Sequence, residues 1–247
     1  MDRDVRELAG AWTRYQRHAI HDPSPALAPW VEHYWEARWD YAEPYRQKIV
    51  PRANVHLSFG QGRADVNGLC SSCQIKVLEG RDHVFGVAFR PGCFRPFLGA
   101  SVSTITDRVI PAAEVFGPDL PTTLDVPTMD AFLLKHLPDE DARAQQAAAA
   151  VELVAEDKTL TRVERLADEL GLSMRGLQRL FSEYVGIGPK WVIRRHRLHE
   201  VTARMAAGGA IDWAALAADL GYADQGHFIR DFRSMFGETP TWYAQRY

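Results

Sequence analysis

Two short segments of the chain carry basic and amide side chains at spacings that put them on one face of a helix. They are Arg175, Gln178 and Arg179 in the first segment, and Gln225, His227, Arg230 and Arg233 in the second. Arginine and glutamine can make paired hydrogen bonds to guanine and adenine edges, which aliphatic side chains cannot. On one helix alone, these residues would more simply form a solvated surface, so the interpretation depends on whether the two segments are related.

The two segments belong to a helical unit that the chain contains twice. Residues 166–192 read LADELGLSMRGLQRLFSEYVGIGPKWV, and residues 216–243 read LAADLGYADQGHFIRDFRSMFGETPTWY. With one inserted residue after Gly221, the leucine, alanine, glycine, arginine, phenylalanine and proline positions coincide. An internal repeat of this kind indicates a repeated supersecondary structure. Because the outward-facing polar chemistry is repeated as well, the repeat favours a binding role over a solvated face.

Each unit has the pattern of a helix, a tight turn and a second helix. In the first unit, Thr161 and Glu164 have the spacing of a capping box, Gly171 permits the positive φ angle of a tight turn, and Ser173 can cap the second helix. In the second unit, Gly221 and Asp224 take the last two roles, and phenylalanines every four residues predict a buried face. The second helices, about 174–184 and 225–235, are the predicted recognition helices, the elements that enter the major groove in helix-turn-helix proteins.

A continuous helix over residues 189–205 is predicted to join the units. Its length of roughly 25 Å approaches the ~34 Å turn of DNA, so one chain could enter two successive major-groove segments. Arg194, Arg195 and Arg197 on this helix either touch phosphate or pair with acidic neighbours.

Residues 158–247 resemble the DNA-binding domain of the AraC family of bacterial transcription regulators. The residues that carry the resemblance follow the pattern Gly-Tyr-x-Asp, His-Phe-x-Arg-x-Phe, Phe-Gly-x-Thr-Pro and Tyr between Gly221 and Tyr243. The resemblance implies base contacts by Arg175, Gln178 and Arg179 in the first unit, and by Gln225, His227 and Arg230 in the second. Gly226 departs from the more usual polar residue there, which implies looser readout by the second helix.

A short helix is predicted over residues 3–18. The amino-terminal part then alternates in the manner of β-strands between residues 31 and 90, with turn signals between the runs. The segments NVHLSFG, FGVAFRPGCFRPFLGAS and TDRVIP resemble a β-rich domain found ahead of AraC-type modules, over residues 20–118, which implies a half-barrel. Trp35, His56 and Arg90 are its candidate ligand-binding residues. The predicted fold class is therefore α+β multidomain: a β-rich half-barrel with short helices in a regulatory or dimerisation domain (1–140), followed by an all-α domain of two helix-turn-helix units (141–247).

Two further features of the sequence leave alternatives open. Cys70, Cys73 and Cys93 with His56 or His83 could supply zinc ligands or sense redox state, but ordinary free thiols are the simpler interpretation and no metal is predicted. The alanine-rich helix at 141–157 is expected to pack in the core, with a dimerisation seam as the alternative.

Composition narrows the class of protein. The net charge is −3 overall, but residues 158–247 hold +3 and residues 1–157 hold −6, which suggests different partners for the two parts. The absence of a signal core, of a membrane span and of an even cysteine count favours a soluble cytoplasmic protein. Since the sequence has no nucleophile elbow or phosphate loop, no enzyme and no cofactor are predicted.

The sequence therefore predicts a sequence-specific DNA-binding transcription regulator, with an activator role among the expectations. The predicted partners are double-stranded DNA, a small-molecule effector, a second copy in a homodimer and RNA polymerase, with no membrane. The competing hypothesis is a small-molecule-binding or enzymatic β-barrel whose helical tail mediates protein contacts.

Overall fold

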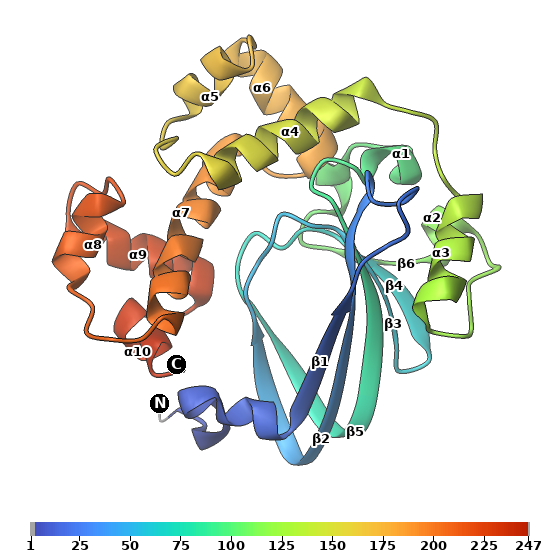
Figure 1. Ribbon diagram of the computed structural model, residues 1–247, viewed down its shortest axis with the longest axis horizontal. Coiled ribbons are helices and arrows are strands. Elements are labelled where there is room, and N and C mark those ends of the chain that lie inside the picture. Colours follow the sequence, from blue (N-terminus) through green and yellow to red (C-terminus); the bar gives the residue numbers. More distant parts are fainter. Residues whose placement is uncertain (1–2, 247) are drawn as a thin grey trace.

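The amino-terminal half is built on a curled antiparallel sheet. In the computed structural model, which describes residues 3–246, the sheet has six strands in the order β1-β2-β5-β3-β4-β6 (Figure 1). The strands are β1 (Gln16–His21), β2 (Val31–Ile49), β3 (His56–Gly60), β4 (Arg63–Asn67), β5 (Gln74–Phe89) and β6 (Val109–Pro111). The long strands β2 and β5 pair along most of their length, with irregularities between Val31 and His33 and between Tyr41 and Tyr45 that help the sheet to bend.

The two faces of the sheet have different neighbours. Alternation along β2 sends Tyr34 to one face, where its hydroxyl donates to Asp130 of α3 at 2.5 Å. The opposite face carries Trp35, Ala37 and Trp39, which belong to or pack on a second apolar cluster between β2 and β5. The short helical elements of this half are η1 (Val5–Arg14), α1 (Arg95–Leu98), η2 (Val102–Ile105), α2 (Ala113–Phe116) and α3 (Val126–Lys135).

The predicted amino-terminal helix over residues 3–18 is largely wrong. Residues 5–14 form a 3₁₀-type segment that is interrupted at Leu8–Gly10 by non-helical backbone, and Gln16 already belongs to β1. Residues 16–21 form a strand and not a helix because they pair in register with residues 34–39 of β2. Local helix propensity does not anticipate such a long-range contact.

The carboxy-terminal half is all helical. Its elements are α4 (Ala142–Glu156), α5 (Val163–Glu169), α6 (Met174–Leu180), the π-helical turn η3 (Phe181–Val185), α7 (Pro189–Ala206), α8 (Trp213–Asp219), α9 (Gln225–Phe236) and α10 (Pro240–Ala244). Figure 1 shows α5 and α6 near one end of α7, and α8 to α10 beside its other end. The α+β architecture predicted from the sequence is confirmed, as is the helix that joins the two units.

The alanine-rich helix α4 packs inside the molecule. Ala144, Ala147 and Ala150 are buried together with Val151 and Val154. A Cβ on Gly92, just after β5, would lie 2.9 Å from the Cβ of Ala147, so small residues allow the loop and the helix to approach closely. The packed interpretation of this helix therefore holds in the structure.

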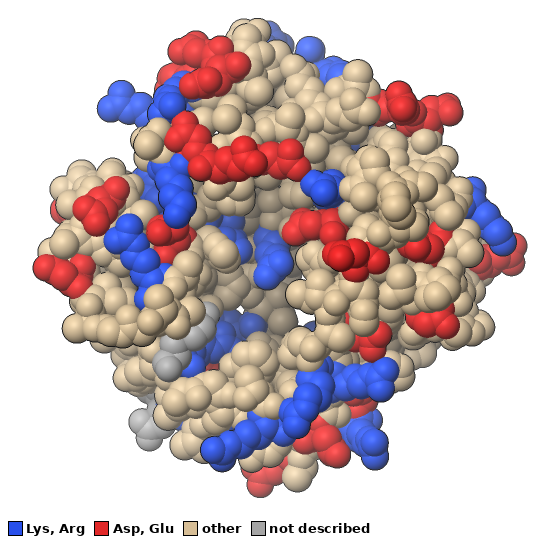
Figure 2. Space-filling view, in the orientation of Figure 1, with Lys and Arg blue, Asp and Glu red and all other residues tan. Residues whose placement is uncertain are grey.

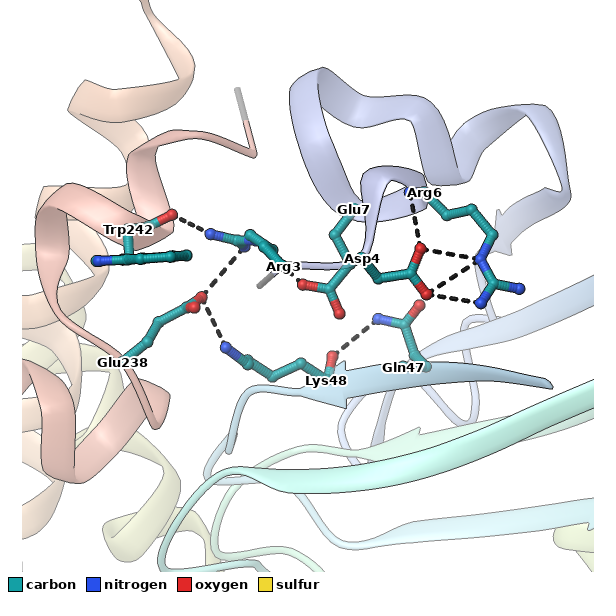
Figure 3. A network of polar contacts seen from close by, with 8 residues as sticks. All are labelled: Arg3, Asp4, Arg6, Glu7, Gln47, Lys48, Glu238 and Trp242. Carbon is teal, nitrogen blue, oxygen red and sulfur yellow. Dashed lines mark hydrogen bonds and ion pairs between the residues drawn. The ribbon is translucent and has the colours of Figure 1, made fainter. Parts of the chain in front are cut away.

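Polar contacts attach both helical units to the amino-terminal half. The first unit receives hydrogen bonds from Thr106 Oγ1 to the Gly186 carbonyl at 2.6 Å and from Ser101 Oγ to the Ser182 carbonyl at 3.1 Å. At the second unit, the Glu238 carboxylate pairs with Lys48 at 2.6 Å and with Arg3 at 3.2 Å (Figure 3). The two halves are thus in direct contact at both units.

Candidate nucleic-acid interface

The scaffold of the first unit is α5, a glycine turn, and α6 continued by η3. Gly171 has a φ of +63° at the turn, and the Leu172 amide donates to the Ala167 carbonyl at 2.9 Å, which closes the end of α5. Ser173 Oγ caps α6 by accepting from the Gly176 amide at 3.1 Å. The predicted capping box is wrong: α5 begins at Val163 after Arg162, and no side chain caps it.

The second unit repeats these devices. Gly221 has a φ of +73°, and the Tyr222 amide donates to the Ala217 carbonyl at 2.9 Å. Asp224 Oδ1 caps α9 by accepting from the His227 amide at 2.7 Å. The side chains of Phe228, Phe232 and Phe236 are buried, as their spacing predicts. Burying this stripe determines which face of α9 remains on the outside.

All seven candidate base-contacting side chains are exposed. They are Arg175, Gln178 and Arg179 on α6, and Gln225, His227, Arg230 and Arg233 on α9. Apart from His227, none of these side chains has a hydrogen bond or ion pair within residues 3–246. Nearby arginines outside the two helices are engaged, because Arg165 pairs with Asp157 at 2.8 Å and Arg204 with Asp219 at 3.4 Å. The structure thus leaves donors accessible on both recognition helices.

His227 has neighbours that fix its position. Its ring packs edge-on against Tyr222 with centroids 5.2 Å apart, and its Nε2 lies 3.8 Å from Asp231 Oδ2. Asp231 in turn pairs with Arg194 of α7 at 3.5 Å. Asp231, which the sequence interpretation missed, therefore lies between His227 and Arg194. Its spacing of four from His227 on one helix is the signal that could have found it.

The three arginines of α7 make contacts inside the protein. Arg194 pairs with Asp231, and Arg195 is buried with its Nε donating to the Pro51 carbonyl at 2.6 Å. Arg197 donates to the Thr161 carbonyl at 3.1 Å and lies over the Tyr222 ring. Of the two predicted alternatives, phosphate contact or pairing with acidic neighbours, the structure provides the second for Arg194 alone, whereas Arg195 and Arg197 donate to backbone carbonyls.

A cation that the sequence interpretation did not single out lies at the beginning of α7. Lys190 is exposed in the first turn of the helix and forms no ion pair or hydrogen bond with the described chain. The amino-terminal end of a helix favours phosphate, through free amides and the helix dipole. The sequence Gly188-Pro189-Lys190, which follows the first recognition helix within a few residues, is the signal that could have found it.

The candidate effector residues do not form one group. Trp35 Nε1 donates to His56 Nδ1 at 3.1 Å across Gly86 of the intervening strand, whose added Cβ would collide with the Trp35 ring. Burial lowers the pKa of His56 to about 4, so the ring is neutral and can accept this bond. Arg90 lies elsewhere, with Nε donating to the Ala28 carbonyl and Nη1 to Glu152.

The cysteines lie in desolvated surroundings. Cys93 is buried, which raises the pKa of its thiol to about 11, and burial also raises the pKa values of the half-buried Cys70 and Cys73. A raised pKa disfavours the reactive thiolate. Within residues 3–246, no group of three or more His, Cys, Asp or Glu side chains is arranged to hold a metal ion. None of the described helices is long and apolar enough to cross a membrane.

Two family models match the chain. Residues 19–111 match one described as a domain of unknown function (DUF6597), and residues 166–246 match one described as a helix-turn-helix domain. The XylDLEGF operon transcriptional activator 1 of Pseudomonas putida is 36% identical over 81 residues, which make up 32% of this chain and 24% of that protein. The chain thus spans about a quarter of the length of the curated relatives it matches.

Solved structures resemble parts or most of the chain. A probable AraC family transcriptional regulator from Rhodopseudomonas palustris is 28% identical, covers 43% of this chain and 97% of its own, and has a TM-score of 0.36. ToxT from Vibrio cholerae is 12% identical, covers 94% of this chain and 98% of its own, and has a TM-score of 0.40.

Proposed function

We propose that this chain, an AraC-family protein by its carboxy-terminal helix-turn-helix domain, is a sequence-specific DNA-binding transcription regulator. The observation that carries the proposal is the pair of capped helices, α6 and α9, whose base-compatible side chains are exposed and largely without partners in the protein. A solvated bundle would not need exposed arginine and glutamine side chains on the second helix of both units. A DNA duplex uses both.

In the proposed mechanism, α6 with η3 and α9 enter successive segments of the major groove. The 18 residues of α7 span roughly 27 Å, which suits two helices that approach positions one DNA turn of about 34 Å apart. Arg175, Arg179 and Arg230 supply fork-shaped donors for guanine, and Gln178 and Gln225 supply amides for adenine. Lys190 contacts phosphate and helps to set the register, but reads no sequence.

The amino-terminal domain is proposed to control this binding, because it touches both units. We expect the protein to work in the cytoplasm, where it would meet DNA. Control by a small effector is part of this proposal, whereas homodimer formation and contact with RNA polymerase stay predictions. Residues 1–140 and 141–247 remain the proposed limits of the two domains.

The test is the affinity of the full chain for a selected duplex and for a scrambled duplex of the same composition, at two salt concentrations. A sequence-specific regulator should prefer the selected duplex at both concentrations. Both affinities should fall as salt rises, because binding releases cations from the phosphates and this release is less favourable at high salt. Equal affinity for the two duplexes, or no binding, would contradict the proposal. The latter result would favour the competing function, a β-barrel with a helical tail for protein contacts.

A further inference from the structure

A cleft of about 440 Å³ lies where the half-barrel meets α4 and α7. Its polar lining includes Arg52 and Asn54 before β3, and Arg195, His196 and His199 of α7. Figure 2 shows a hollow near the centre of the view, with Lys and Arg atoms at its floor. The volume falls within the range of small-molecule sites, and the position between two domains is one where such sites are common.

The cleft holds positive charge that the protein does not neutralise. Arg195 is only 8% exposed, and its one hydrogen bond, from Nε to the Pro51 carbonyl, leaves the terminal nitrogens without a partner in the described chain. Arg52 is exposed and makes no hydrogen bond or ion pair within residues 3–246. Burial, together with repulsion from the positive charge of Arg52, lowers the pKa of Arg195 to about 10.

The carboxylates of the cleft already have partners. Glu152 accepts from Arg90 at 2.8 Å, and Glu32 accepts from Asn54 at 2.5 Å and lies 3.6 Å from His33. These contacts, together with the positive charge of Arg52, hold the pKa of Glu32 at about 2, so Glu32 is a fixed anion with its own hydrogen bonds. Neither acid is paired with Arg52 or Arg195. Because a buried cation without a counter-charge is costly, the lining favours an anion brought from outside.

Apart from Glu152 and its partner Arg90, the wall of the cleft formed by Pro91 and α4 is apolar. Pro91 follows β5, and α4 contributes Ala148, Val151 and Ala155. The small alanine side chains leave room beside the helix that larger residues would fill. A ligand that matches both walls has an acidic group at one end and a compact apolar body at the other.

We propose that this interdomain cleft binds a small organic anion, with its acidic group held by Arg52 and Arg195 and its apolar body against α4. Because α7 joins the two helix-turn-helix units, an anion that ties α7 to the half-barrel changes how freely those units adjust to DNA. Binding itself follows from the cleft, whereas this coupling rests on the proposed DNA-binding function.

The binding test uses the full chain without DNA and three matched probes: phenylacetate, phenyl phosphate and the neutral phenylacetamide. At millimolar concentration, at least one of the two anions should raise the melting temperature, since a ligand that binds only the folded state stabilises it. The neutral amide should not. A larger shift with phenylacetate would indicate a carboxylate site, and a larger shift with phenyl phosphate would indicate a phosphate site. No shift with either anion, or an equal shift with the amide, would overturn the proposal.

Two variants locate the site. Arg52→Ala removes an exposed cation and should fold normally, yet weaken binding at least tenfold; the matched control is Arg63→Ala, an exposed arginine of β4 outside the cleft. Ala155→Trp keeps every charge but fills the cleft and should abolish the shift. If Arg52→Ala and Arg63→Ala bind the anion equally well, the site is not this cleft.

The coupling is measured separately, as the affinity for the selected duplex with and without the anion. The wild-type chain should change its affinity on adding the anion, and Arg52→Ala should not. An unchanged wild-type affinity overturns the coupling alone, whereas loss of sequence preference in the anion-free protein overturns the proposed function.

Discussion

The two helix-turn-helix units have the same scaffold but different reading surfaces. Both have a glycine of positive φ in the turn and a side-chain cap on the second helix. Aligned through these features, Arg175 and Gln178 of the first unit correspond to Gly226 and Ile229 of the second. Ile229 is partly buried and packs on the core. The scaffold therefore requires particular residue types at the turn, the cap and the core, whereas the exposed face of the second helix can differ between the units. At these two aligned positions, α6 carries more hydrogen-bond donors than α9.

The two units also differ in how they are attached to the amino-terminal domain. Gly186 and Gly237 hold equivalent positions with positive φ, and an added Cβ would approach Val102 at 2.9 Å and Cys73 at 2.5 Å respectively. The equivalent tryptophans diverge: Trp191 is 8% exposed and donates to the Ser71 carbonyl, whereas Trp242 is 44% exposed. The second unit relies instead on the ion pairs of Glu238 (Figure 3).

The largest effect should come from emptying the core of either unit. Phe181→Ala and Phe232→Ala each remove a fully buried ring at equivalent positions, so each should cost about 3–5 kcal/mol of unfolding free energy, measured by chemical denaturation. Similar costs would support the equivalence of the two scaffolds. A cost below about 1 kcal/mol in one unit would show that its core is not packed as described.

Substitutions on the exposed faces of α6 and α9 should change the affinity for DNA and leave the stability of the fold unchanged. Arg175→Ala and Arg230→Ala should each cost roughly 1–3 kcal/mol on the preferred duplex and relax discrimination at one base position. The two affected positions should lie about one helical turn apart. Unfolding curves should be unchanged because both side chains are exposed. Equal weakening on selected and scrambled duplexes would instead assign the residue to phosphate contact.

Glu238→Gln tests the attachment that only the second unit uses. The change keeps the shape of the side chain but removes the charge that pairs with Lys48 and Arg3, both largely covered in the structure. We expect a loss of about 1–3 kcal/mol in unfolding free energy. Exposed Glu164→Gln on α5 is the matched control and should be neutral. If the two variants unfold alike, the pairs of Glu238 do not hold the second unit in place.

A pH dependence of stability belongs to the amino-terminal domain and its contact with α7. Burial lowers the pKa values of His56 and His196 to about 4 from an ordinary value of 6.5, so the folded state favours the neutral rings. Their stabilisation is complete above pH 6.5 and is lost as pH falls from there towards 4. The melting temperature should fall over that window. His56→Gln, which retains an acceptor for Trp35, should reduce the slope; an unchanged slope would contradict the assignment.

Local and repeated patterns made the helical half predictable. The turn glycines, the caps Ser173 and Asp224, the phenylalanine stripe of α9 and the joining helix all follow from short-range spacing and appear as predicted. In the amino-terminal half, strand alternation identified β2, β3 and β5, but β1 replaced part of a predicted helix because pairing with β2 decides it.

Contacts between distant segments could not be read from the sequence. The burial of Arg195 depends on Pro51, and the Trp35–His56 bond depends on two strands that a third separates. The separation of Arg90 from these two residues has the same origin, because Arg90 is held by Ala28 and by Glu152 of α4. For this reason the interdomain cleft emerges only from the fold, whereas the recognition helices are visible in the sequence.

Selection of bound sites from random duplexes by the full wild-type chain tests the central claim most directly. Two capped helices joined by α7 should enrich two short base patterns whose centres lie about one DNA turn apart. The pattern read by α6 should be the more sharply defined, because α9 has Gly226 and Ile229 where α6 has Arg175 and Gln178. No enrichment, or a single pattern with nothing one turn away, would contradict the claim that both helices read bases.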